Sequence, residues 1–279
     1  MTQISHLPLD PGEAAKLQQT ATRLERLLEA SDKFVGPSSD PPVAGSRFDR
    51  ARKADLGEPY DFGYLLLFAG EDHLRTLLTV IKSGYLPGFS LYSLLRVAGE
   101  AIVRCRHLLD PAITETERFA RGLNERLDNL VEQRKAKPDA EGLKHYADRL
   151  SHLEGRALAN GITPIGGPPA TSIKGFGAVQ PSIFDLFDTY FVAGSTTCRY
   201  LGAFIHIKPW VVIRRERAQP TSDPRVANVP TDINVHLFTD VVDGMLDVHD
   251  ACVGYWLGLA GYPPEVWREA KKTPAQAGP

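Results

Sequence analysis

The residues with the clearest chemical potential are an arginine and a histidine in the segment RYLGAFIH, Arg199 to His206. They are seven positions apart, so in an α-helix both side chains project from one face, about 10 Å apart along the axis. Histidine titrates near neutral pH and can move a proton to or from a reacting oxygen. The arginine guanidinium stays cationic, and its fork fits phosphate oxygens. The pair could therefore bind a phosphate beside a group that transfers protons.

The helix face between these two side chains is predicted to be shallow. Gly202 and Ala203 have almost no side chain, and Ser195 supplies a hydroxyl on the same side. Such a face can admit a phosphate or the matching face of a second subunit. We therefore expect a homodimer, with Ser195 supporting the pair.

A purely structural interpretation of the pair stays open. Arg199 can form an ion pair with a nearby carboxylate, either Asp188 or the acidic face Asp240–Asp250. His206 can end a helix, where an imidazolium meets free carbonyl groups and the negative end of the dipole.

A second polar stripe runs along the helix expected from Pro87 to Leu109. It consists of Ser93, Arg96, Glu100, Arg104 and His107. The opposite side is apolar and is expected to face the core. Arg96–Glu100 and Glu100–Arg104 have the i,i+4 spacing that is typical of a solvated ladder of ion pairs. As an alternative, we hypothesise that Arg96 and Glu100 lie close to the arginine–histidine pair in the centre of a bundle.

The last long helix carries an acidic stripe. Its members are Asp232, His236, Asp240, Asp243, Asp247 and Asp250. Di-metal bundles use Glu-x-x-His pairs, and this helix contains none, so we expect no metal. The stripe is interpreted as a solvated acidic face or as the partner of an arginine-bearing stripe. Three scattered cysteines without a CxxC pair, Cys105, Cys198 and Cys252, are expected to be buried and reduced.

Helical periodicity dominates the chain. The expected helices cover residues 11–33, 60–83, 87–109, 113–136, 139–158, 181–207 and 232–261. The segments 36–59 and 160–180 contain many Gly and Pro residues and are expected to be long surface loops. The segment PWVVIRRER, from residue 209, could form a short strand. The sequence therefore predicts one all-α domain over residues 1–279, a multi-helix bundle whose motif-bearing helices lie within 181–262.

Composition excludes few functions. The chain has 279 residues, of which 43% are hydrophobic and 24% charged, with a formal net charge of −2. It therefore has no overall attraction to nucleic acid or to anionic membranes. A local basic patch follows the motif, formed by Lys208, Arg214, Arg215 and Arg217. Neither a signal peptide nor an apolar run of membrane-spanning length is evident, so we expect a cytoplasmic protein that does not enter the membrane.

The segment RYLGAFIH resembles the signature of the HEPN superfamily of helical bundles, an Arg followed after four to six residues by a His. The wider pattern is similar to bacterial helical proteins of the DUF5677 type, in which an earlier helix carries an Arg with a Glu four positions later, as Arg96 and Glu100 do. The resemblance extends over about residues 60 to 260. It implies metal-independent cleavage of RNA without a cofactor, with Arg199 and His206 as catalytic residues. In the family, two protomers usually bring their motifs together.

This resemblance also implies a toxin or defence role, in which an antitoxin or another regulatory protein is a partner. RNA is then the substrate, DNA is not, and the basic patch beyond His206 would bind the RNA. The alternative is a non-catalytic helical protein that binds a small molecule or a protein partner in a pocket between helices. That pocket would use Trp210, Tyr200, Phe204 and the Arg96/Glu100 pair.

Overall fold

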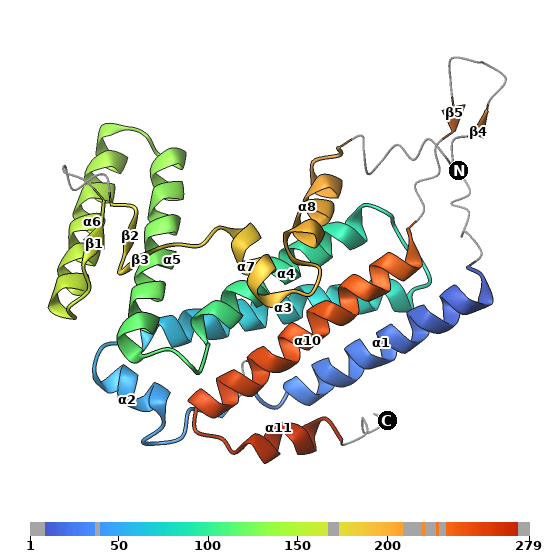
Figure 1. Ribbon diagram of the computed structural model, residues 1–279, viewed down its shortest axis with the longest axis horizontal. Helices are drawn as coiled ribbons and strands as arrows, with labels where there is room; N and C mark the ends of the chain where they lie inside the picture. The colour runs from blue at the N-terminus through green and yellow to red at the C-terminus, as the bar shows by residue number, and fades with distance from the viewer. Residues whose placement is uncertain are drawn as a thin grey trace.

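The computed structural model describes residues 9–36, 40–166, 173–208 and 233–272, and the strands β4 (Gln219–Pro220) and β5 (Ala227–Asn228), which pair antiparallel. Most of this is helical and only a few residues are in strands, so the expected all-α multi-helix fold is confirmed (Figure 1). The long helices are α1 (Pro11–Ser31), α3 (Glu58–Lys82), α4 (Ser90–Leu108), α5 (Glu115–Ala136), α6 (Ala140–Ala159) and α10 (Val235–Leu259). The shorter helices are α2 (Arg47–Lys53), α7 (Ile183–Tyr190), α8 (Gly194–Ile205) and α11 (Pro264–Ala270).

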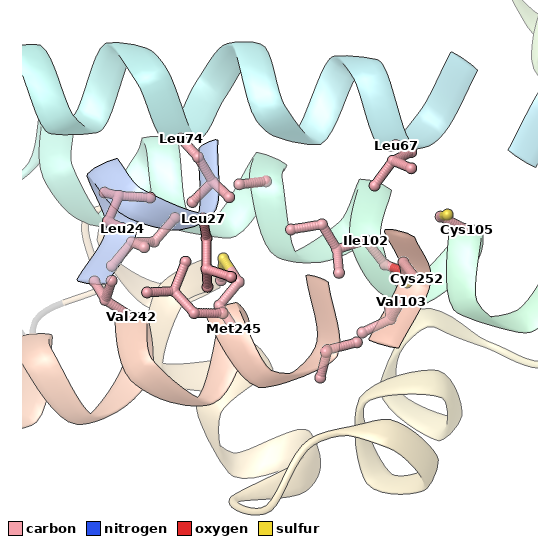
Figure 2. Packing of buried hydrophobic residues seen from close by; sticks show 14 of the residues in the cluster. Leu24, Leu27, Leu67, Leu74, Ile102, Val103, Cys105, Val242, Met245 and Cys252 are labelled. Atoms are coloured by element: carbon pink, nitrogen blue, oxygen red, sulfur yellow. The ribbon is translucent and has the colours of Figure 1, made fainter. Parts of the chain in front are cut away.

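A central bundle of α1, α3, α4 and α10 holds the larger of two hydrophobic cores. Figure 2 shows the apolar side chains of these four helices meeting at the centre: Leu24 and Leu27, Leu67 and Leu74, Ile102 and Val103, Val242 and Met245. Gly70 allows α3 to approach α4 closely, because a Cβ there would lie 2.9 Å from Ile102 Cγ1. All three cysteines are buried, as expected. Within the described residues, no helix combines the length and the apolar character that crossing a membrane requires.

A second, smaller core lies between α5 and α6, which form an antiparallel hairpin joined by a short turn. Residues 160–180 were expected to be irregular, and this is wrong in part. They contain a sheet of two-residue strands in the order β1 (Pro164–Ile165), β2 (Gly175–Phe176) and β3 (Ala178–Val179), all antiparallel. The sheet is attached to α5 through Asn124, whose side chain bonds the Phe176 N–H at 2.7 Å and the Ala178 carbonyl at 3.0 Å. Long-range side-chain contacts of this kind have no local sequence pattern.

One buried arginine joins the hairpin to the bundle. Arg118, near the start of α5, is 0% exposed. Its guanidinium donates to the backbone carbonyls of Leu108 and of Asp110 (2.7 Å), which end α4, and lies 4.9 Å from the ring centre of Tyr60 on α3. These carbonyls are the orphan acceptors of a helix C-terminus, so the arginine satisfies groups that would otherwise be buried and unpaired.

The single helix expected over residues 181–207 is wrong. The chain forms two helices there, α7 and α8, which meet at a corner. Gly194 opens α8 with φ of +54°, and a Cβ at this position would lie 2.3 Å from Asp188 Oδ1. That carboxylate accepts the Ser195 N–H at 2.6 Å and so caps the start of α8. The apolar periodicity continues across the corner, which is why the sequence pattern conceals it.

The loop expected over residues 36–59 contains a helix, α2, with Ser46 as its N-cap. Phe48 of this helix is 1% exposed and stacks on Tyr60 with ring centres 4.9 Å apart. Residues 47–53 contain four basic side chains, and this one aromatic residue anchors the segment to the bundle. Helix α11 was not expected either; its Trp267 packs against Phe34 at 6.3 Å.

Candidate functional site

Arg199 lies on the exposed side of α8, as the helical spacing predicted. Its guanidinium carbon is 4.5 Å from the ring centre of Phe184 on α7, a cation–π contact. The carboxylates considered as its structural partners are engaged elsewhere, because Asp188 caps α8 and the acidic face of α10 pairs with α1 and α11. Among the described residues Arg199 has no ion-pair partner, so its charge is available to a ligand.

His206 is exposed and ends α8 as its C-cap. The turn after it is a Schellman motif, in which the Lys208 N–H donates to the Ala203 carbonyl at 2.8 Å and the Ile207 N–H to the Phe204 carbonyl at 3.2 Å. Ile207 occupies the left-handed position of this turn with φ of 49°, where glycine is usual. A residue with a side chain there costs roughly 1–2 kcal/mol. The backbone that presents His206 is therefore strained.

The surface between Arg199 and His206 is open. No described atom lies within 4 Å of a Cβ built on Gly202. Three exposed apolar side chains lie in or next to α8: Val192 (101% exposed), Ile205 (41%) and Ile207 (66%). Ala203 was expected on the open face, and this is wrong: it is buried and Ile205 is exposed instead, because the corner at Gly194 rotates α8 relative to one continuous helix. Ser195 is half-buried at the start of α8, where its backbone is capped.

Arg96 and Glu100 form the expected ion pair, with Arg96 Nε 2.5 Å from Glu100 Oε1. They do not form part of a solvated ladder. The side chain of Arg96 is 11% exposed and its Nη1 donates to the Cys198 carbonyl at 3.0 Å, directly before Arg199 in α8. The hypothesis that this pair lies near the motif is therefore right for Arg96, which contacts α8 next to Arg199. Burial raises the pKa of the Cys198 thiol, although Arg96 opposes the shift, so this cysteine is not an activated nucleophile.

The other end of α8 lies against the start of α4. Tyr92 stacks on Phe204 with ring centres 4.0 Å apart, and Tyr200 packs edge-on against Phe204 at 5.1 Å. These rings are two of the residues that the small-molecule alternative placed around its pocket, and here they pack against each other and against α4. Trp210, which the same alternative used, lies outside the described residues. Phe204, two residues before His206, also lies 6.2 Å from the ring of Phe89, directly before α4.

The rest of the polar stripe on α4 is covered by α5 and α7. Arg104 pairs with Glu125 of α5, which is 1% exposed, instead of with Glu100. The side chain of His107 is buried as well, at 9% exposure. The prediction of a solvated ladder is wrong here because α4 is a central helix. Its apolar side packs on α3 and α10, and its polar side packs on polar residues of the neighbouring helices.

His107 has an unusual environment. Its Nδ1 lies 3.2 Å from Nη1 of Arg121, whose guanidinium also donates to the His107 carbonyl at 2.6 Å, and the Tyr190 hydroxyl is 3.5 Å from the same ring nitrogen. Burial, reinforced by the charge of Arg121, lowers the pKa of His107 to about 4. A guanidinium can only donate, so Nδ1 is the acceptor and the neutral ring carries its proton on Nε2.

The acidic stripe of α10 is the partner of a cationic stripe on α1, one of the two roles expected for it. Lys16 pairs with Asp240 at 2.6 Å, and Arg23 pairs with Asp243 at 3.1 Å and Asp247 at 2.5 Å. Asp232 lies outside the described residues. Across the described ranges, no three His, Cys, Asp or Glu side chains come together in a way that could hold a metal ion.

Of the expected RNA-binding patch, only Lys208 is described, and its side chain is exposed. Arg214, Arg215 and Arg217 lie outside the described residues, as does the strand considered for PWVVIRRER.

The structure also contains a cavity of about 620 Å³ that the sequence did not reveal. It lies between α5 and the β1–β3 sheet. Its lining includes His107, Glu117, Ala120, Arg121, Ile162 and Phe176. The sequence singled out His107 as one end of the polar stripe on α4, but nothing in the sequence indicated which residues of α5 face it.

A comparison of the chain with known protein families, with curated proteins and with solved structures finds no match to any of them. The candidate sites therefore rest on the geometry of this chain alone.

Proposed function

We propose that this protein is a metal-independent endoribonuclease in which Arg199 and His206 act on the RNA phosphodiester. The observation that supports the proposal is the open face of α8, where both side chains are exposed on either side of Gly202. The strained turn at Ile207 adds to it, because strain of this kind concentrates at functional sites.

The chemistry follows from the two side chains. His206 in its neutral form takes the proton from a ribose 2′-OH, and the oxygen attacks the adjacent phosphorus. The bond from phosphorus to the 5′-oxygen breaks, that oxygen takes up a proton from water, and the protonated His206 then returns its proton to the hydroxide that is left. Arg199 stabilises the charge on the non-bridging oxygens as it develops. The products are a 2′,3′-cyclic phosphate and a 5′-hydroxyl.

A second copy of the chain is part of the proposal. On one chain the two side chains start about 10 Å apart along the helix axis, which is far for both to reach one phosphate. If the α8 faces of two protomers meet about a two-fold axis, the Arg199 of one protomer lies opposite the His206 of the other. The exposed apolar side chains of Val192, Ile205 and Ile207 would then be buried around the site.

The test is cleavage of single-stranded RNA by the purified protein in the presence of EDTA. We expect cyclic-phosphate ends, and we expect His206→Ala to lower the rate about 10²–10⁴-fold. Arg199→Ala should lower it comparably. Matched controls are His145→Ala, an exposed histidine on α6, and Arg134→Ala, whose guanidinium lies 4.8 Å from the ring centre of Tyr146 much as Arg199 lies over Phe184. Both controls should cleave at the wild-type rate.

Mixing the two inactive variants tests the shared site. Heterodimers of Arg199→Ala and His206→Ala contain one intact pair if each site takes its arginine and histidine from different chains. Activity should then reappear on mixing. If the mixture stays inactive while the wild type cleaves, the site lies within one chain. If a broad panel of RNAs stays intact with wild-type protein, the ribonuclease proposal is wrong.

A further inference from the structure

We infer that the cavity between α5 and the β1–β3 sheet is a binding site for a small uncharged molecule that has a flat apolar body and a carbonyl group. This inference does not depend on ribonuclease activity. The cavity volume of about 620 Å³ lies within the range of small-molecule sites. Figure 1 shows its two walls, α5 and the adjacent strands, at one end of the molecule.

The cavity is preformed. The side chain of Asn124 accepts from the Phe176 N–H at 2.7 Å and donates to the carbonyls of Phe176 at 3.2 Å and Ala178 at 3.0 Å. These bonds fix the sheet against α5 and use both polar atoms of the asparagine. A ligand entering the cavity therefore does not have to order the wall, which lowers the free-energy cost of binding.

The floor of the cavity is apolar and its rim is exposed. Ala120, Ile162 and Phe176 are buried members of the hairpin core that also line the cavity. Thr114 and Thr116 at the rim are exposed, so a ligand can enter without opening the fold. An apolar floor of this kind suits a flat ring.

The charges inside the cavity are already balanced. Arg121 Nη2 donates to Glu117 Oε1 at 2.7 Å, and its Nη1 donates to the His107 carbonyl at 2.6 Å. His107 is itself uncharged near neutral pH, because burial and Arg121 hold its pKa at about 4. A charged ligand would have to break the ion pair or remain without a counter-charge, whereas an uncharged ligand leaves it intact.

His107 can supply a hydrogen-bond donor to the ligand. The proton of His107 lies on Nε2, since Nδ1 faces the guanidinium of Arg121. Nε2 has no hydrogen-bond partner in the described part of the chain. It is not fully buried, so a ligand can reach it. It therefore offers an N–H at the wall of the cavity, and a carbonyl oxygen is the acceptor that an uncharged ligand can provide.

The inference is tested with three probes that share one ring system: 1-naphthamide, 1-naphthoate and naphthalene. Binding to wild-type protein is measured by two-dimensional ¹H–¹⁵N NMR at pH 7, because the shifted amides locate the site. We expect saturable shifts around residues 107, 120 and 162 with 1-naphthamide. Naphthalene should bind about 3–10-fold more weakly, since it lacks the carbonyl that accepts one neutral hydrogen bond. 1-Naphthoate should be the weakest ligand, because its charge has no partner.

Two variants and a control complete the test. His107→Phe keeps a ring but removes the N–H, so the amide should bind it no better than naphthalene does. Ala120→Leu fills the floor and should abolish binding of all three probes. His145→Ala, on the exposed side of α6, should bind as the wild type does. Tight binding of 1-naphthoate, shifts located elsewhere, or no binding of 1-naphthamide to folded wild-type protein would each overturn the inference.

Discussion

The central bundle and the α5–α6 hairpin each have a hydrophobic core, but different interactions hold the two regions in place. The bundle buries broad apolar stripes of four long helices, with leucines such as Leu67 and Leu74 at its centre. The hairpin has a narrow core built on Phe119 and Phe176, and it is attached to the bundle through polar side chains, above all Arg118 and Glu125. Apolar packing therefore makes the bundle stable, and directional polar contacts fix the position of the hairpin.

Truncating a buried side chain should destabilise the whole fold when the residue lies in the bundle, but mainly the hairpin when it lies in the hairpin. Leu67→Ala removes a buried side chain at the centre of the bundle and should lower the free energy of global unfolding by about 2–5 kcal/mol. Phe176→Ala should cost about 3–5 kcal/mol, but mainly within the hairpin. Hydrogen exchange would then show amides of α5 and α6 losing protection while α4 and α10 keep theirs. Equal loss throughout the chain would show that the two cores unfold as one unit.

The contact between the regions should weaken in acid. His107 has a pKa of about 4 in the folded protein and an ordinary value of 6.5 when unfolded. Between these values the unfolded chain binds a proton that the folded chain does not, so stability falls as pH drops from about 6.5 to 4, by up to about 3 kcal/mol. The charged groups that act on this ring are Arg121 and Asp110, and Tyr190 also contacts it.

Urea unfolding at pH 7.5 and pH 4.5 measures this effect. Carboxylates elsewhere titrate in the same range, so the comparison that matters is with His107→Phe, which cannot take up the proton. The stability of this variant should depend less on pH. An unchanged pH dependence would mean that His107 titrates alike in the folded and unfolded chain.

The smallest expected effect concerns the motif on α8, outside both cores. Ile207→Gly relieves a left-handed backbone and loses little burial within its own chain, so it should raise the free energy of unfolding of the monomeric chain by about 1 kcal/mol. Ile205→Gly is the matched control, since this residue is also exposed but ends the helix proper. It should destabilise the protein by about 0.5–1 kcal/mol. Thermal unfolding should show that Ile207→Gly raises the stability and Ile205→Gly lowers it. If both variants are destabilised, the backbone at Ile207 is not strained.

The helices of the fold were largely predictable from sequence, because apolar spacing repeats along each of them. α1 begins where Asp10 and Glu13 form the capping box around Pro11, and α5 and α6 lie within a residue or two of their expected bounds. The corner between α7 and α8 was not predictable in this way. It depends on the φ of Gly194 and on the carboxylate of Asp188, neither of which alters the hydrophobic pattern.

The sites were predictable only in part, for a related reason. Periodicity correctly placed Arg199 and His206 on one exposed face, but it also put Ala203 there, and that residue is buried because the corner at Gly194 rotates α8. The fate of Arg104 and His107 depends on which helix covers them, and a polar stripe can be covered by buried polar residues such as Glu125. The cavity was missed because its walls are far apart in sequence.

The two ends of the hairpin segment also meet at this cavity. The chain leaves the bundle just after His107 and returns through Pro181, and both residues line the same space. The hairpin segment is therefore arranged like an inserted module, because its first and last residues lie close together in the bundle. Insertions with close ends are tolerated without disturbing the rest of the fold. A molecule held there would touch host and insert at once. Its binding free energy would therefore add directly to the cohesion of the two parts.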